Sequence, residues 1–346
     1  ILQQAEDKLM DLGYDTKVGW EYEFYVFEDD HDAIRAGDIK DLAVIGNNRN
    51  AYSIARQNYL LPIIEEFFHR MNSTGAPLEY IHTEYSRGMY EYTTVPTSAV
   101  ASADGLARGR LYLRELLNEQ GLTSTAMTAL CSVENPTHSG IHANVSLWKD
   151  GKNAFWDGKG LSEFGQHFLA GVMRTMQDFH LIFRPWVNSY RRFDPEAFCP
   201  CHVAWGDDNH FVSVRVSHGL DGEKKTRVEH RVAGTDTCPH LVLAAILQGG
   251  IYGIENKLEL QPGIGLEEIE AAELLTNTLP DAITRFKDSK IARDLFGDAF
   301  VEHYCQVREE EWAEYEEWCK ENGIEIDHNG PEVTKWEYKK YFDWLV

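Results

Sequence analysis

Alternating apolar and polar positions predict a strand near the amino end of the chain. In GWEYEFYVFEDD, residues 19–30, aromatic and β-branched residues dominate from Trp20 to Phe27, as is typical of a half-buried strand. Glu21 and Glu23 interrupt this run two positions apart. Because side chains at i and i+2 of a strand point the same way, both carboxylates share one face, roughly 7 Å apart. Two like charges beside a core therefore call for a compensating partner.

The remaining periodicity predicts further strands and helices in an irregular order. Apolar residues recur at helical spacing before Gly13 and predict an amphipathic helix over 1–12. Further helices are predicted over 54–71, 98–120 and 162–184, and the chain from Pro239 on is predicted to be mainly helical, with aromatic-rich segments at 298–320 and 334–345. Strands are predicted over 78–85, 89–95, 124–132, 140–148, 210–217 and 226–232. Since helices and strands do not alternate strictly, we expect an α+β fold with a mostly antiparallel sheet.

Composition narrows the possible partners. The 346 residues are 43% hydrophobic, enough for one large domain or two ordinary ones. With 33 Lys and Arg against 56 Asp and Glu, the net charge is −23, which disfavours nucleic acid and anionic membrane surfaces as partners. No apolar run approaches the roughly 18 residues of a membrane span, and the first residues do not resemble a signal peptide. We therefore expect a cytoplasmic protein that binds neither nucleic acid nor membrane.

The cysteines and the glycines exclude two further classes. The six cysteines form no CxxC pair, so we expect reduced and mostly buried thiols. No glycine-rich phosphate loop of the P-loop or dinucleotide type is present. A nucleotide would therefore have to be bound in another way.

Several predicted strands carry one apolar face and one face of acids, arginines and histidine. Alternation places Glu229 between Arg227 and Arg231 on one face, and His142 opposite the apolar Ile141 and its neighbours. Glu84 and Glu91 flank the short turn of EYSRGMYE. For any single strand, a solvated outer face explains this pattern. Taken together, the acids would repel one another unless a cation neutralised them, and oxygen ligands with one imidazole suit Mg²⁺ or Mn²⁺ better than zinc. Both interpretations remain open at this point.

Six segments in order resemble the catalytic domain of the glutamine synthetase family, across nearly the whole chain. They are GWEYEFYVF, HTEYSRGMYE, HSGIHANVSLW, NSYRRFDP, RVEHRVAGTDTCPHLVLAAIL and VTKWEYKKYFDWL. The RVAG motif at residues 231–234 and the segment around Phe198 are most similar to the branch that joins glutamate to polyamines, the γ-glutamylputrescine synthetase type. The resemblance implies one catalytic domain over 1–346, with a curved, mostly antiparallel sheet flanked by helices. It also implies that the family's preceding β-grasp domain is absent from this chain.

The resemblance further implies a site with two or more Mg²⁺ or Mn²⁺ ions and ATP as co-substrate. One ion would be held by Glu23, Glu84 and Glu91, and a second by Glu21, His142 and Glu229. Catalysis would involve Glu91, Arg215 and His210. Substrate binding would involve Arg192, Arg231, His138, Tyr52 and Phe198. ATP binding would involve Arg215, Asn144 and Ser146.

Several positions depart from the family pattern. Phe198 replaces the flap glutamate that accepts the ammonium proton, so an aromatic side chain would line the amine pocket instead. His210 replaces an arginine that stabilises the transferring phosphoryl group, a loss that can cost several kcal/mol. Thr137 and His138 replace the Asn-Gly pair that holds the amino acid end of glutamate. Asn144 replaces a histidine, and Met89 a glutamine.

The sequence therefore predicts an ATP-dependent ligase that joins the γ-carboxylate of glutamate to a polyamine, alkylamine or arylamine through γ-glutamyl phosphate. Two alternatives stay open. One is ordinary glutamine synthesis from ammonia. The other is a catalytically weak regulatory homologue that binds nucleotide or metal. The partners would be glutamate, an amine and ATP, and the resemblance implies a ring-type homo-oligomer.

Overall fold

A curved nine-stranded sheet runs through the centre of the computed structural model of this chain, which describes residues 1–39, 43–46, 51–130, 138–193, 199–330 and 332–343. The strands lie in the order β2-β3-β1-β5-β9-β8-β7, with β4 paired to β1 and β6 to β5. Their bounds are β1 (Asp15–Glu28), β2 (Leu78–Thr83), β3 (Met89–Thr94), β4 (Leu122–Thr125), β5 (Ile141–Lys149), β6 (Lys152–Asn153), β7 (Trp205–Asp207), β8 (Val214–Ser217) and β9 (Arg227–His230). All these pairs are antiparallel except β7 with β8. The predicted α+β class is confirmed.

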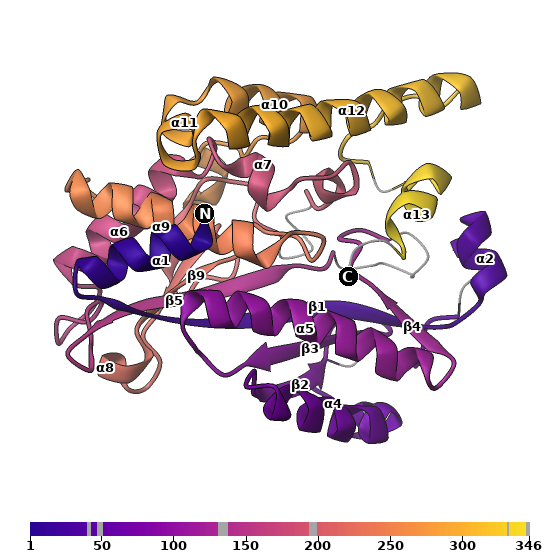
Figure 1. Cartoon of the computed structure of the whole chain (residues 1–346), viewed down its shortest axis with the longest axis horizontal. Coiled ribbons are helices and arrows are strands. Elements are labelled where there is room, and N and C mark those ends of the chain that lie inside the picture. The colour runs from indigo at the N-terminus through magenta and orange to yellow at the C-terminus, as the bar shows by residue number, and fades with distance from the viewer. Residues whose placement is uncertain (40–42, 47–50, 131–137, 194–198, 331, 344–346) are drawn as a thin grey trace.

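Helices flank this sheet, and Figure 1 shows them in separate groups. They are α1 (Leu2–Asp11), α2 (His31–Ala36), α3 (Ile54–Gln57), α4 (Leu61–Ser73), α5 (Ala99–Asn118), α6 (Glu163–Thr175), α7 (His180–Phe183), α8 (Gly222–Lys225), α9 (Pro239–Glu255), α10 (Leu279–Asp288), α11 (Lys290–Phe296), α12 (Asp298–Asn322) and α13 (Lys335–Tyr341). Helix α4 packs on α5, α6 on α9, and α10 and α11 on α12. No helix in these described ranges has both the length and the apolarity that crossing a bilayer requires.

Two long predicted helices are interrupted in the structure. The segment 54–71 begins with α3 and a 3₁₀ turn, and α4 then starts at Leu61 with Pro62 in its first turn. Since proline has no N–H to donate to the preceding turn, it begins a helix more readily than it continues one. The segment 162–184 likewise divides into α6 and α7. The short elements α2, α8, β6 and β7 are absent from the predicted pattern.

Strand β1 is longer than predicted and positions most of the site. It spans 14 residues because Asp15 to Tyr22 pair with β5, while Glu21 to Tyr25 pair with β3 on the other side. Its apolar side chains, among them Trp20, Phe24 and Val26, are fully buried in the core. The opposite face of the same strand presents Glu21 and Glu23, as strand alternation predicts.

A buried ion pair attaches the last helix to the rest of the fold. Arg191 donates from Nε and Nη2 to the two carboxylate oxygens of Glu337 on α13, at 2.8 and 2.9 Å. The Arg191 Nη1 group also donates to the backbone carbonyls of Asp327 and Gly330. Because both side chains are almost fully buried, this pair fixes α13 beside the segment that carries Arg192.

Candidate active site

Four neighbouring strands bring four of the five predicted glutamates to one cavity of about 800 Å³, and the fifth, Glu229, does not line it. In the register, Glu23 lies opposite Glu91 across β1 and β3, and Glu21 lies opposite His142 across β1 and β5. Glu84 follows the last residue of β2, and its backbone N–H bonds to Met89 across the turn. The cavity wall includes Glu21, Glu23, Glu84, Glu91 and His142. Residues separated by more than a hundred positions in the chain therefore share one site.

The turn between Glu84 and Glu91 depends on glycine. Gly88 adopts a φ of +73°, and a Cβ there would lie 2.0 Å from the Val44 side chain. Any other residue would be strained in this conformation and would also clash. Gly88 therefore allows the two acids to face the cavity from adjoining strands.

One half of the cavity is acidic. Glu84 and Glu91 share His82, whose Nδ1 lies 3.3 Å from Glu84 Oε1 and whose Nε2 lies 3.2 Å from Glu91 Oε1. Burial and then the Glu23 carboxylate raise the pKa of Glu84 to about 7. Burial, followed by the charges of Glu21 and Glu23, raises the pKa of Glu91 well above its usual range. The protein thus holds these carboxylates together against their mutual repulsion.

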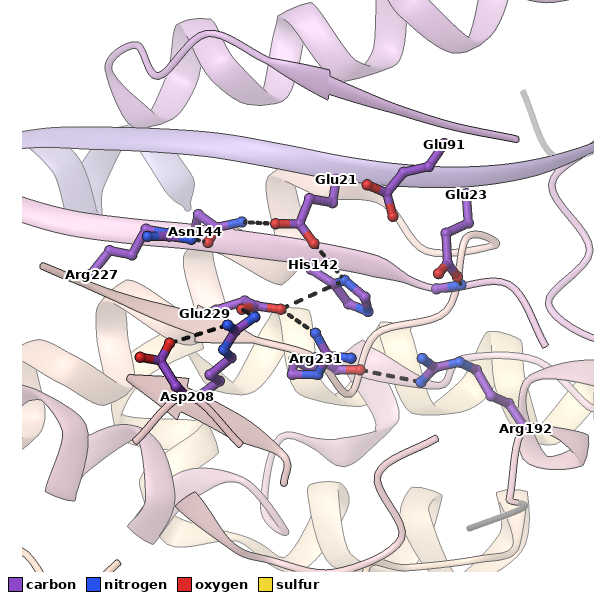
Figure 2. A network of polar contacts seen from close by, with 12 residues as sticks. Glu21, Glu23, Glu91, His142, Asn144, Arg192, Asp208, Arg227, Glu229 and Arg231 are labelled. Atoms are coloured by element: carbon purple, nitrogen blue, oxygen red, sulfur yellow. Dashed lines mark hydrogen bonds and ion pairs between the residues drawn. The ribbon is translucent and has the colours of Figure 1, made fainter. Parts of the chain in front are cut away.

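Glu21 sits at the boundary between the two halves (Figure 2). Its carboxylate bonds His142 Nδ1 at 2.9 Å and accepts from Asn144 Nδ2 at 3.0 Å. Burial alone would raise the pKa of Glu21, but the hydrogen bond and charge of His142 and the charge of Arg231 outweigh it and lower the pKa to about 2. Glu21 therefore remains ionised, whereas the pKa values of Glu84 and Glu91 are shifted in the opposite direction.

The other half of the cavity is basic. Glu229 is fully buried and bonds the guanidinium groups of Arg231 and Arg215, the latter at 3.4 Å. Arg215 also donates to Asp208 at 3.1 Å. Arg192 lies across the cavity and donates to the backbone carbonyl of Arg231 at 3.2 Å. Three arginines from distant segments thus surround one side of the space with positive charge.

Several buried nitrogen atoms at this site have no hydrogen-bond partner among the described residues. They are Nε2 of His142 and the Nε atoms of Arg192, Arg215 and Arg231. Gly140 also leaves room for the guanidinium of Arg192, since a Cβ at this glycine would lie 2.6 Å from Nη2. Because buried donors are normally satisfied, these atoms indicate that the site is built around a bound molecule.

The donor set fits a hard divalent cation. Two groups have ligand atoms mutually within 4.8 Å, one formed by Glu21, Glu91 and His142 and the other by His82, Glu84 and Glu91. Carboxylate oxygens with one imidazole are ligands that Mg²⁺ and Mn²⁺ accept. This grouping differs from the predicted partition, because Glu23 and Glu229 fall outside both groups. Glu23 accepts instead from the Gly140 N–H at 2.5 Å, and Glu229 Oε1 lies 3.8 Å from His142 Nδ1.

Most of the predicted substrate and phosphate residues also lie along the cavity. Tyr52, His138 and His210 are part of its wall. Tyr52 has a φ of +58°, which is rare for an aromatic residue and marks a strained position. Burial, and then the charges of Arg215 and Arg231, lower the pKa of His210. Phe198 and Thr137 lie outside the described residues.

A second cavity of about 490 Å³ adjoins the first and shares Glu21, Tyr80 and Arg227 with it. Asn144 and Ser146 line this second space, together with Lys17, Lys224 and Lys225. Lys17 Nζ lies 3.5 Å from the centre of the Trp148 ring, which makes a cation–π contact. The combination of lysines and an aromatic surface suits a phosphate-bearing, planar ligand.

The sequence pattern did not single out four residues of the first cavity. They are Tyr80, His82, Tyr85 and Phe211. Tyr80, His82 and Glu84 lie at every second position of the segment LEYIHTEY, residues 78–85. Strand alternation could therefore have identified Tyr80 and His82. Tyr85 and Phe211 lie in irregular segments, where no periodicity identifies the direction of a side chain.

Comparisons with known proteins agree with this geometry. The profile of the glutamine synthetase catalytic domain family matches residues 1–326. A gamma-glutamylethanolamide synthetase, GlnA4 from Streptomyces coelicolor, is 30% identical over 346 residues, which are 99% of this chain and 70% of that protein. A glutamate–isopropylamine ligase from a Pseudomonas species is 32% identical over 350 residues, 99% of this chain and 72% of that protein.

A solved structure of GmaS without ligand has the same fold. It superposes with a TM-score of 0.79 and 23% identity, and covers 97% of this chain and 74% of that chain. At this level of identity the likeness concerns the fold alone. The curved sheet and its flanking helices are thus an arrangement found in known proteins.

Proposed function

Since this chain belongs to the glutamine synthetase family of ligases, we propose that it joins the γ-carboxylate of glutamate to an organic amine, with conversion of ATP to ADP. The observation that carries this proposal is the division of the cavity into an acidic and a basic half. The acidic half suits divalent cations, and the basic half suits the carboxylate and phosphoryl oxygens of the substrates. Neither half alone would favour phosphoryl transfer to a carboxylate.

In the proposed reaction, the γ-carboxylate attacks the terminal phosphorus of ATP and ADP leaves. The amine then displaces phosphate from γ-glutamyl phosphate and forms an amide. The cations would be held by Glu21, Glu23, Glu84, Glu91, His142 and Glu229. When bound, such ions would neutralise the phosphoryl oxygens.

The positions of the other side chains in the two cavities suggest which part of the substrates each would bind. Arg192 and Arg231 bind and orient glutamate through its carboxylates, and His138 lies beside them on the same cavity wall. Arg215 binds the transferred phosphoryl group, as a guanidinium fork suits phosphate oxygens. The second cavity, with Asn144 and Ser146, holds the nucleotide. His210 donates a hydrogen bond from a neutral ring, since its pKa is lowered.

An organic amine is favoured over ammonia by the aromatic part of the wall. Tyr52, Tyr85 and Phe211 line the cavity and present apolar surface that an alkyl or aryl group can bury. The name of one relative specifies an ethanolamide product and that of another an isopropylamine substrate, which supports the same substrate class. Tyr52 lies next to the acidic half, and burial followed by Glu84 and Glu91 raises its pKa to about 12, so it remains a neutral donor.

The direct test is phosphate release with glutamate, ATP and Mg²⁺ or Mn²⁺ across a panel of amines. The panel contains ammonia, methylamine, ethanolamine, isopropylamine, putrescine and aniline. We expect at least one organic amine to reach half-maximal rate at a lower concentration than ammonia. Turnover with ammonia alone would contradict the choice of an organic amine. As a matched pair, Phe211→Ala is expected to raise the KM for the amine, whereas Phe211→Leu is expected to preserve it.

His210 favours a second candidate, a regulatory protein that binds nucleotide and metal without completing ligation. Its neutral ring offers less stabilisation to a transferring phosphoryl group than a guanidinium does. Calorimetry with Mn²⁺ and a non-hydrolysable ATP analogue distinguishes the two candidates. Binding without glutamate-dependent hydrolysis would favour the regulator, and hydrolysis that requires glutamate would favour the ligase.

A further inference from the structure

His82 faces two of the acidic side chains of the first cavity from β2, the strand at one end of the sheet. In the register of β2 with β3, His82 lies directly opposite Glu91, and Glu84 follows it by two positions. One ring nitrogen therefore comes close to each carboxylate, with Nε2 3.2 Å from Glu91 Oε1 and Nδ1 3.3 Å from Glu84 Oε1. The cation ligands implied by the family resemblance do not include His82.

The contacts of the His82 ring determine which nitrogen carries the proton. Nδ1 lies 3.2 Å from the backbone carbonyl oxygen of Thr83, which can only accept a hydrogen bond, and the Glu84 carboxylate is a second acceptor on that side. We therefore assign the proton of the neutral ring to Nδ1. Nε2 then directs its lone pair at the Glu91 carboxylate. Two acceptors that face each other at 3.2 Å repel unless a proton or a cation lies between them.

This pattern is typical of a histidine that binds a metal ion. Such a histidine normally donates its other ring N–H to a backbone carbonyl or a carboxylate, which fixes the tautomer and the orientation of the ring. Adjacent ligands of one octahedral cation lie roughly 3 Å apart, because each lies about 2.1 Å from the ion. The 3.2 Å between Nε2 and Glu91 Oε1 is close to that spacing. His82, Glu84 and Glu91 also offer ligand atoms that all lie within 4.8 Å of one another.

Two aromatic rings hold the imidazole in this orientation. The Tyr80 ring stacks on His82, with ring centroids 5.5 Å apart and an interplanar angle of 24°, and the Tyr52 ring lies 4.9 Å away. The Tyr52 N–H donates to the Thr83 carbonyl at 2.8 Å, so the acceptor of the Nδ1 proton is itself fixed. The His82 ring therefore has little freedom to turn Nε2 away from Glu91.

A second, independent observation in the same cavity points to a bound cation. His142 is 4% exposed, and its Nε2 has no hydrogen-bond partner among the described residues. Glu91 belongs to both groups of close ligand atoms, one with His142 and one with His82. One carboxylate thus lies between two imidazoles, and each imidazole has a nitrogen lone pair that suits a metal ion.

We propose that His82 is a further ligand of the divalent cation at Glu84 and Glu91, and that its nitrogen makes this site prefer Mn²⁺ to Mg²⁺. Mg²⁺ is a hard cation that binds oxygen ligands and keeps several waters, whereas first-row transition metals accept imidazole more readily. The proposal rests on the cation site of the proposed function, but not on which acid or amine is joined. Metal binding alone can therefore test it.

The test is calorimetric titration of the metal-free chain with Mn²⁺ and, separately, with Mg²⁺, in the absence of substrates. Two variants separate the functions of the ring. In His82→Asn, the amide can still donate to Thr83, but no atom replaces Nε2. In His82→Gln, the amide reaches the position of Nε2 and can donate to Glu91. In both variants we expect the Kd for Mn²⁺ to rise roughly tenfold or more, and the Kd for Mg²⁺ to change less than about threefold.

Pulsed electron paramagnetic resonance of bound Mn²⁺ gives a direct readout, because a coordinated imidazole nitrogen modulates the electron spin echo. We expect both His82 variants to lose part of this modulation and to retain the part that comes from His142. His69→Gln changes an exposed histidine on α4, and it is expected to leave both Kd values and the echo unchanged. Circular dichroism melting verifies the fold of each variant.

The outcomes separate this inference from the proposed function. If wild type bound neither cation, both the proposed function and the role of His82 would fail. If wild type bound both cations and His82→Gln kept the wild-type ratio of the two Kd values, His82 would be only a hydrogen-bond donor to Glu91, and this inference alone would be overturned. An unchanged echo in a folded His82→Asn protein would overturn it as well.

Discussion

Replacing Glu84 with glutamine tests whether the acidic half of the cavity is built to hold a cation. Glu84 is nearly buried, with 10% of its side chain exposed, and its pKa is raised from 4.5 to about 7. A raised carboxyl pKa means that the folded state holds its proton more tightly than the unfolded state. The contribution of Glu84 to the free energy of unfolding is therefore highest below pH 4.5 and decreases as the pH rises to about 7.

The size of this effect follows from the shift. One pKa unit corresponds to about 1.4 kcal/mol, so a raised pKa of this size destabilises the folded protein by about 3 kcal/mol at pH 8 in the absence of metal. Glutamine is nearly isosteric and does not ionise. With a chelator present, we expect Glu84→Gln to increase the free energy of unfolding at pH 8 by about 2 to 3 kcal/mol, and to change it little at pH 4.

Divalent metal should remove most of this difference between the two proteins. A cation at a hundredfold excess over its Kd stabilises wild type by about 2.7 kcal/mol, whereas Glu84→Gln lacks one charged ligand and gains less. The assay is urea denaturation at pH 8 with a chelator and with Mn²⁺. Glu325→Gln, at an exposed position, serves as a control and is expected to stay within about 0.5 kcal/mol of wild type. If Glu84→Gln were less stable than wild type in the chelator, Glu84 would be a structural residue and the reasoning would be refuted.

Three further predictions concern single side chains. Glu91→Gln is expected to lower the rate of glutamate-dependent phosphate release more than about a hundredfold while the circular dichroism spectrum is retained. The reason is that mutating even a residue that only hydrogen-bonds to a metal ligand typically lowers activity by about 10–100-fold. Wild-type turnover would contradict the proposed role of Glu91. Glu337→Gln is expected to lower the free energy of unfolding by about 3 to 5 kcal/mol, because it leaves Arg191 as an unpaired buried charge; an unchanged urea midpoint would show that the pair is dispensable. Burial raises the pKa of Glu311 to about 7, so stability should fall as the pH rises from about 4.5 to 7, and Glu311→Gln should flatten this slope in pH-dependent melting; an identical slope would exclude Glu311 as its source.

Part of the fold could be predicted because periodicity is a local property. Strand alternation identified the two faces of β1, β5 and β9, and it correctly separated Val228 and His230 in the core from Glu229 on the site face. The position of Pro62 was equally visible, yet the segment around it was predicted as one helix. Interruptions of this kind depend on how the flanking turns pack, and the apolar pattern alone does not report this.

By itself, the sequence determined which residue types are available, on which face of each strand they lie, and which family the six motifs resemble. Only the tertiary structure decided which of these residues meet. The register of β1 with β3 and β5 sets Glu23 against Glu91 and Glu21 against His142. The packing of other segments brings His82 and Phe211 to the same cavity. The physical reason is that alternation acts over neighbouring residues, whereas strand register is fixed by packing and hydrogen bonds between segments far apart in the chain. The contact between His240 and Asp104 has the same origin, since it exists only where α5 and α9 meet.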